Sequence, residues 1–230
     1  MPPYCTLCPH TGICLPADLD TDELKRFEDV ILKQKSLERG QYLFCSGDAF
    51  KGLFAIRSGC FKTTVIYDEG SEHVQHFHLA GELIGFDAVY QSRHASSAIA
   101  LSDASACYIS FATMMQLAEQ FLKLQFRLFR LFSRYALRTS SLTGDYSAEE
   151  RVAAFLLSLS ARLSAAGSSA SELDLAMSRE DIANHLRLAS ETVSRVLAKF
   201  KMEHLIDVKG KRITLIRLDG LRELAARMVP

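Results

Sequence analysis

Three cysteines near the start of the chain have the spacing of a metal or cluster ligand set. They follow the pattern Cys5-x2-Cys8-x5-Cys14. The segment around them, residues 2–16, is rich in Pro and Gly and is therefore more typical of a loop than of a helix or strand, and a loop can bring three thiols to one centre. Soft thiolates favour zinc or an iron–sulfur cluster. Either would need a fourth ligand from elsewhere in the chain.

Cys45, Cys60 and Cys107 are the candidates for this fourth ligand, and His10 offers a nitrogen donor inside the loop. Redox-active thiols and incidental cysteines are the alternatives. No apolar signal segment or membrane-spanning run is present in the sequence, so we expect a cytoplasmic protein with no membrane partner. In that compartment cysteines are more often reduced, metal-bound or redox-active than paired in structural disulfides.

The 230 residues leave room for two modest domains, and an apolar content of 48% is enough for real cores. The net charge is zero, but the charges are unevenly distributed. Residues 178–217 carry nine basic against five acidic side chains. This mild basic bias indicates phosphate contacts only where a nucleic-acid-binding motif accompanies it.

The region from Arg39 to Ile109 alternates short apolar runs with Gly-containing turns at a spacing of roughly ten residues, which is typical of antiparallel strands. Residues 53–56 and 62–67 are examples of such strands. Gly59 and Gly81 lie where turns favour positive φ. We therefore predict a small antiparallel β-roll or barrel.

The stretch from Phe111 to Thr143 contains neither Gly nor Pro and predicts one helix of about 45–50 Å. Most of its second half is apolar, more than one flank of a domain would cover, so we expect it to pair with a second copy of itself. A buried core helix and a basic membrane or calmodulin-type segment are the alternatives. One face carries a basic stripe, which would add like-charge repulsion if it faced the second copy: Lys123, Arg127, Arg130, Arg134 and Arg138.

Two short amphipathic helices within residues 178–200 meet near Arg187 and predict a helix-turn-helix. Ser178 and Ser190 are each placed to cap one of them. Arg187 occupies a turn position where Gly would be easier to accommodate. The expected core residues are Ile182, Leu186, Leu188, Val193, Val196 and Leu197.

The polar face of the second helix carries Glu191, Ser194, Arg195 and Lys199, which we expect to contact DNA. Arg195 can bond guanine O6 and N7, Glu191 can accept from cytosine N4, and Ser194 can meet a thymine or adenine edge. A β-hairpin from 207 to 215 follows and completes a winged helix. Its basic residues suit the phosphate backbone: Lys209, Lys211 and Arg212.

The series RGQYLFCSGDAFKGLFAIRSGCFKTTVIYDEGSEHVQHFHLAGELIGF resembles the β-roll of the CRP/FNR superfamily of transcription regulators. The resemblance covers nearly the whole chain. It implies an α+β fold with an N-terminal antiparallel β-roll of the cyclic-nucleotide-binding type, a long dimerisation helix and a C-terminal winged helix-turn-helix. The expected divisions are a cluster-binding loop over 1–17, the roll over 18–110, the long helix over 111–145 and the DNA-binding domain over 146–230.

The nucleotide-binding members of that superfamily use a Glu for the ribose and an Arg-Ser or Arg-Thr pair for the cyclic phosphate. Here Phe86 stands at the Glu position, Ser96 and Ser97 stand at the pair, and Arg93 lies three residues too early. A buried phosphate without a guanidinium would be poorly compensated. We therefore do not expect this protein to bind a cyclic nucleotide.

The cysteines are instead similar to those of the FNR branch, in which an oxygen-labile [4Fe-4S] cluster is bound by an N-terminal Cys-x2-Cys-x5-Cys and a distant Cys. Cys107, in the last strand before the long helix, matches the fourth ligand. Cys45 and Cys60 have no counterpart, and we expect them to be small core residues of strands. Glu191-x-x-Ser194-Arg195 matches the branch's recognition signature for TTGAT-type half-sites.

The resemblance implies a transcription regulator, not an enzyme, that senses oxygen or nitric oxide through cluster-dependent dimerisation. The homodimer would bind palindromic double-stranded DNA and contact RNA polymerase, for which the turn at residues 68–70 is a candidate. The main alternative is a regulator of the same architecture that responds to a haem-bound gas or a small effector, with its cysteines binding zinc or no metal. A thiol redox enzyme is less well supported, because no thioredoxin-like βαβ pattern is present.

Overall fold

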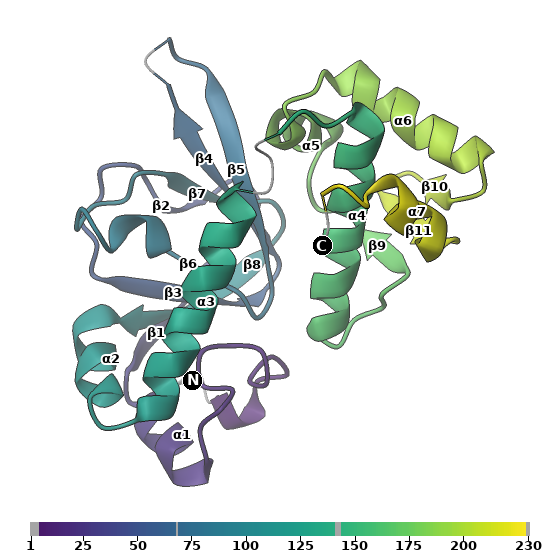
Figure 1. Ribbon diagram of the computed structural model, residues 1–230. Coiled ribbons are helices and arrows are strands. Elements are labelled where there is room, and N and C mark those ends of the chain that lie inside the picture. The colour runs from purple at the N-terminus through teal and green to yellow at the C-terminus, as the bar shows by residue number, and fades with distance from the viewer. Residues whose placement is uncertain (1–4, 68, 141–143, 229–230) are drawn as a thin grey trace. The chain divides into compact units, whose positions relative to one another are not determined.

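The computed structural model describes residues 5–67, 69–140 and 144–228 (Figure 1). The chain forms two compact units, Met1–Leu137 and Arg138–Pro230. Three features expected from the sequence reach beyond the described residues: the first four residues of the cysteine loop, Asp68 of the turn proposed for polymerase contact, and Thr143 at the end of the long helix.

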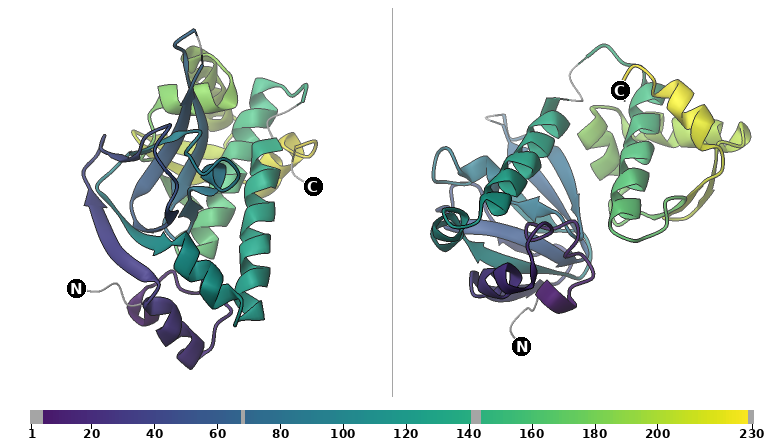
Figure 2. Two further views of the ribbon diagram at one scale, coloured as in Figure 1. Left: turned by 90° about the vertical axis from the view of Figure 1, so that its left-hand side faces the viewer. Right: turned by 60° about the horizontal axis from the view of Figure 1, so that its bottom comes forward.

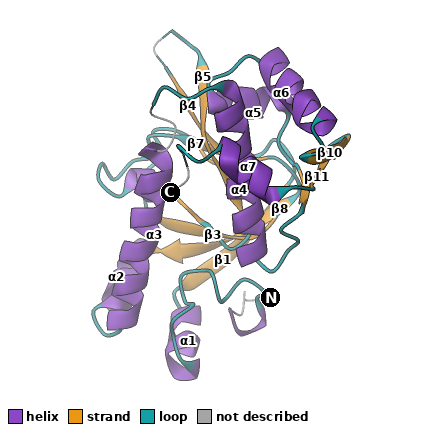
Figure 3. Cartoon of the chain, turned by 45° about the vertical axis from the view of Figure 1, so that its right-hand side comes forward, coloured by secondary structure: helices purple, strands orange, loops and turns teal. Residues whose placement is uncertain are grey.

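The first unit is built on two four-stranded antiparallel sheets, as the alternating pattern predicts (Figure 3). The first sheet has the strand order β1-β8-β3-β6 and the second has the order β2-β7-β4-β5. The bounds are β1 Ile31–Leu37, β2 Tyr42–Phe44, β3 Gly52–Ser58, β4 Cys60–Ile66, β5 Glu72–Leu79, β6 Leu83–Ile84, β7 Ser97–Ala100 and β8 Ala104–Ser110, with a short 3-10 helix, η2, at Phe86–Ala88.

Apolar side chains between the two sheets form the core of the roll, with Phe61, Phe54 and Ile56 among the buried residues. The expected positive φ is present at Gly59 (80°) and Gly81 (86°). A Cβ at Gly81 would collide with the side chain of Ile13, so this turn needs glycine both for its backbone conformation and for the close approach of the N-terminal loop.

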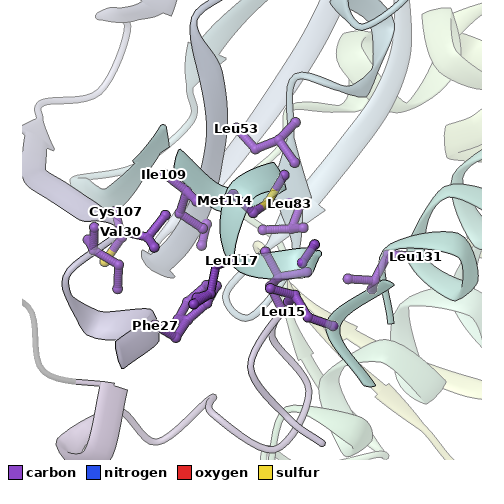
Figure 4. Close-up of a cluster of buried hydrophobic side chains, with 14 of the residues drawn as sticks. Leu15, Phe27, Val30, Leu53, Leu83, Cys107, Ile109, Met114, Leu117 and Leu131 are labelled. Atoms are coloured by element: carbon purple, nitrogen blue, oxygen red, sulfur yellow. The ribbon is translucent and has the colours of Figure 1, made fainter. Parts of the chain in front are cut away.

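The N-terminal segment is anchored to the roll by its own apolar residues. A 3-10 helix, η1 (Cys5–Leu7), opens it, and α1 (Thr21–Glu28) closes it with a capping box between Asp20 and Glu23. Leu15 and Phe27 have no exposed surface. Figure 4 shows both in the cluster that also contains Cys107 of β8. The segment is therefore part of the core of this unit.

The expected single helix after the roll is wrong in one respect, because the chain breaks between α2 (Phe111–Ala118) and α3 (Leu122–Ser140). Arg26 of α1 donates to the Gln120 side chain and lies over the Phe121 ring at 4.7 Å. Gln125 Nε2 bonds the Ala118 carbonyl at 2.7 Å, which satisfies one of the groups left free at the end of α2. These contacts outweigh the helical propensity of the sequence, which is only a weak preference.

Helix α3 has an inner and an outer apolar face. The inner face packs on the roll and contains Leu124 and Leu131, which are buried, and Leu128 and Tyr135, which are partly buried. The outer apolar side chains are exposed: Leu122 62%, Phe126 60%, Phe129 71%, Phe132 49% and Leu137 67%. A fully buried core helix is therefore excluded. Among the described residues, none of the helices has the length and apolar character needed to cross a membrane.

The second unit is a winged helix-turn-helix, as expected. Its elements are α4 Ala148–Ala165, β9 Glu172–Asp174, α5 Arg179–Leu186, α6 Ser190–Met202, β10 Ile206–Lys209, β11 Arg212–Leu215 and α7 Leu218–Leu224. The three strands form one antiparallel sheet in the order β10-β11-β9. Leu188 is partly exposed, whereas the other predicted core residues are buried: Ile182, Leu186, Val193, Val196 and Leu197.

Ser178 caps α5 as predicted, through a capping box with Asp181. The predicted cap at Ser190 is wrong: Ala189 is the N-cap of α6 and makes no side-chain cap bond, and Ser190 is the first helical residue. The turn between the helices has Arg187 in the left-handed conformation, with φ of 55°. This is a strained backbone for a side chain larger than glycine, as the sequence indicated.

Candidate functional site

The four cysteines expected to act together line one cavity of the first unit. Cys5, Cys8 and Cys14 come from the N-terminal loop, and Cys107 comes from β8, a central strand paired with both β1 and β3. Cys107 is 8% exposed. The right-hand view of Figure 2 turns the N-terminal loop towards the reader. Two segments about a hundred residues apart thus contribute cysteines to the same cavity.

Hydrogen bonds within the loop fix its path around the cavity. The backbone N–H of Cys8 donates to the Cys5 carbonyl at 3.0 Å, and that of Cys14 donates to the His10 carbonyl at 2.9 Å. The Thr11 hydroxyl bonds the carbonyls of Cys5 and Cys8 from inside the loop. The loop is therefore tightly wound, and its side chains can converge although it has no regular secondary structure.

Burial disfavours the thiolate form of three of the cavity cysteines: Cys5, Cys14 and Cys107. Burial raises the pKa of Cys5, and the neighbouring Cys14 and Cys107 raise it further. Burial also raises the pKa of Cys14 to about 12 and raises that of Cys107. Thiolates at such positions need a positive charge close by, which is what a bound metal centre supplies as it displaces the protons.

Two other polar side chains reach the same cavity, Arg57 from β3 and His10 from the loop. Arg57 acts against burial and lowers the pKa of Cys107. Burial and the Arg57 charge lower the pKa of His10. The His10 Nδ1 atom is buried and has no hydrogen-bond partner within the described part of the chain. A buried polar atom without a partner is costly, so this cavity is better suited to a bound group than to closure on itself.

Four cysteines are the donor set of a [4Fe-4S] cluster, in which one thiolate binds each iron. Within the described residues, no three His, Cys, Asp or Glu side chains are grouped closely enough to hold a single metal ion. The donor set, the raised thiol pKa values and the orphaned His10 nitrogen together fit a cluster bound by Cys5, Cys8, Cys14 and Cys107.

The two remaining cysteines differ from each other. Cys60 in β4 is 5% exposed and is a core residue, as expected. Cys45 is exposed, contrary to our expectation of a buried strand residue. It lies in a turn just after β2, where its backbone N–H donates to the Asp48 carboxylate at 2.8 Å. That turn contact ends the strand one residue earlier than the apolar pattern predicts.

A carboxylate occupies the place in the roll where a cyclic phosphate would need cations. Asp87 accepts hydrogen bonds from the backbone of Ala95 (3.0 Å) and from the backbone and hydroxyl of Ser96 (3.0 and 2.9 Å). Burial alone would raise the Asp87 pKa, but bonds from His94 and Ser96 hold it below its usual value. Arg93 is exposed and bonds the Gly47 carbonyl. An anion would be repelled here, which supports the expectation that no cyclic nucleotide binds.

In the second unit, Glu191, Ser194 and Arg195 are exposed on α6, as predicted for a DNA-reading face. Lys199 is half-buried, and its ammonium bonds Glu149 of α4 at 2.6 Å. This ion pair holds α6 on α4, so Lys199 is less available for DNA than the sequence pattern indicates. The hairpin residues Lys209, Lys211 and Arg212 are exposed, as a phosphate-contacting wing requires.

Both units match known domain families. A Crp-like helix-turn-helix domain matches residues 150–224, and a cyclic nucleotide-binding domain matches residues 34–121. The fold is also that of the FixK2 structure from Bradyrhizobium japonicum, with a TM-score of 0.76 and 24% identity over 84% of this chain and 96% of that one. The protein therefore belongs to the CRP/FNR family of DNA-binding transcription regulators and is not an enzyme.

Within this family the chain is similar to an anaerobic regulatory protein and to fumarate and nitrate reduction regulatory proteins. It is 41% identical to the anaerobic regulatory protein of Haemophilus influenzae, over 96% of this chain and 87% of that protein. It is 39% identical to the fumarate and nitrate reduction regulatory protein of Yersinia pestis, over 99% of this chain and 92% of that protein. The identity to the protein of the same name from Escherichia coli K12 is also 39%.

Proposed function

We propose that this regulator senses oxygen, with nitric oxide as a second possible signal, through a [4Fe-4S] cluster bound by Cys5, Cys8, Cys14 and Cys107. The observation that carries the proposal is the shared cavity, which is lined by one strand cysteine and three loop cysteines. When bound, the cluster supplies iron that reacts with oxygen. The chain's own contribution is to hold four thiolates in place and to exclude water around them.

The outer face of α3 is proposed as the dimer interface. Its exposed side chains, among them Phe126 and Phe129, would be buried against the same face of a second copy. A wide exposed apolar stripe on a helix is typical of a protein–protein contact. The N-terminal loop and α3 belong to the same compact unit. A change in the loop can therefore alter how firmly α3 is held against the roll.

A dimer places two copies of α6 in successive major grooves about 34 Å apart, over a palindrome. We infer TTGAT-type half-sites, with Glu191, Ser194 and Arg195 at the base edges and Lys209, Lys211 and Arg212 at the phosphates. We also retain Lys199 as a contact that would first have to leave Glu149. RNA polymerase remains a predicted partner, for which Glu69 and Gly70 offer an exposed turn.

Purification without oxygen tests the sensing proposal directly. We expect a brown protein with broad absorption that bleaches in air, with iron and labile sulfide in equal amounts. A colourless protein containing stoichiometric zinc would overturn the cluster in favour of a structural zinc site. A protein that contains haem would support the alternative of a haem-bound gas sensor.

The DNA assignment predicts two different effects of single substitutions. Arg195→Ala is expected to weaken binding by about 1–3 kcal/mol and to remove the preference for one guanine. Lys211→Ala is expected to weaken binding to all sequences alike. It should also lower the slope of log affinity against log salt concentration by about one, the effect of losing one phosphate contact. Titrations on sites that differ by one base pair, at several salt concentrations, separate these effects. Equal losses on every site for Arg195→Ala would contradict a base-reading role.

A further inference from the structure

Three residues of the basic stripe of α3 contact the N-terminal segment of the same chain: Lys123, Arg127 and Arg130. Lys123 bonds Glu23 at 3.0 Å, and Arg130 lies 3.7 Å from Asp18. Arg127 donates from Nε to the Cys14 carbonyl at 3.1 Å and from Nη2 to the Ile13 carbonyl at 2.5 Å. These three residues are thus engaged within one chain, so they give no support for like-charge repulsion between subunits.

Arg127 differs from its neighbours in what it binds. The pair of Arg130 with Asp18 is between side chains that are 72% and 43% exposed, and such surface pairs contribute little. Arg127 is half-buried and bonds main-chain carbonyls, which cannot swing away as a carboxylate can. Its planar guanidinium presents two donors in a fixed geometry, so both bonds form only when the loop lies in one place.

The position of Arg127 connects the two parts of the proposed sensor. On one side it donates to the main-chain carbonyl of Cys14, and the side chain of Cys14 is one of the proposed cluster ligands. On the other side it lies on α3 directly after Phe126, an exposed residue of the outer face. A movement of the loop at Cys14 therefore removes two hydrogen bonds from the helix that carries the dimer interface.

We propose that Arg127 is the positioning residue that transmits the state of the cysteine loop to α3. This inference rests on the proposed function, because it assumes that the cluster orders the loop and that α3 forms the dimer interface. In this role Arg127 acts through its hydrogen bonds to the main-chain carbonyls of Ile13 and Cys14. It makes the dimer affinity depend on the loop.

The test compares dimer dissociation constants of cluster-loaded and cluster-free protein, measured by sedimentation without oxygen. For Arg127→Gln we expect iron and sulfide contents equal to those of the parent. We expect the ratio of the two dissociation constants to shrink by about tenfold, because charge-assisted bonds are lost only from the loaded form. Arg127→Lys should fall between the two, since one ammonium cannot span both carbonyls as the guanidinium does.

Arg130→Gln is the matched control, with the same change of charge on the same face, and should leave the ratio unchanged. Equal weakening of both forms by Arg127→Gln would indicate a merely structural role and overturn the inference. Loss of iron from Arg127→Gln would also overturn it, because Arg127 would then build the cluster site instead of transmitting its state. If the parent protein has the same dimer dissociation constant with and without the cluster, the proposed function is overturned and, with it, this role of Arg127.

Discussion

Cys107→Ser is expected to reduce the bound iron and sulfide to near zero and to weaken anaerobic DNA binding by about 10- to 100-fold. Serine is nearly isosteric, but its hydroxyl does not ionise at neutral pH and cannot replace a thiolate on iron. Cys107 lies on a central strand and lines the same cavity as the three loop cysteines. In the proposed site, losing Cys107 would leave the loop without its attachment to the sheet through the cluster. Metal and sulfide analysis, together with DNA titration, measures both effects.

Two matched controls separate ligand loss from damage to the fold. Cys60→Ser makes the same change in another buried strand, where Cys60 is 5% exposed, compared with 8% for Cys107. Cys45→Ser makes it in an exposed turn. Both variants should keep the parent's iron content and DNA affinity. If Cys107→Ser also keeps them, Cys107 is not a ligand, and the fourth donor must be sought elsewhere, first at His10, which lines the same cavity.

The convergence of the cysteines on one cavity was largely predictable, because it depends mainly on residues that are close together in the sequence. Three of its residues lie within one short loop, and a loop at that spacing can bring them to one point whatever the rest of the fold does. Cys107 depended on the resemblance to the FNR branch. Arg57 was missed, since nothing in the sequence of β3 distinguishes a residue that turns towards the cavity from one that faces solvent. The pairing of β3 with β8 could have indicated Arg57, because it places the strand of Arg57 beside the strand of Cys107.

Two features of the fold were not predicted for a different reason: the break in the long helix and the contacts of the basic stripe. The break at Gln120 depends on Arg26, which lies on α1 and is close only in the folded chain. Within the basic stripe, Arg130 pairs with Asp18 and Arg127 bonds the carbonyl of Cys14, both of which are equally remote in sequence. Helical periodicity correctly predicts which residues share a face, but tertiary contacts decide what that face meets and where the helix stops.

Phe129→Asp is expected to raise the dimer dissociation constant by at least about 100-fold. Phe129 is the most exposed of the outer-face residues of α3, at 71%. A two-fold interface contains each residue twice, so one substitution removes two aromatic anchors and adds two like charges. Because the side chain is exposed in one subunit, the free energy of unfolding of the monomer should change by less than about 0.5 kcal/mol. Sedimentation and thermal unfolding measure the two quantities separately.

Tyr90→Asp is the control, because Tyr90 is 93% exposed on the roll and is not part of the outer face of α3, so it should leave dimerisation intact. The interface also predicts a specific effect on DNA. Phe129→Asp should lose affinity for a palindrome but keep its weak affinity for a single half-site, because α6 lies in the other compact unit and is itself unchanged. Equal losses on both kinds of site would mean that the substitution damages the DNA-reading unit. An unchanged dimer would place the subunit contact on another surface and leave the exposed face of α3 for a different partner.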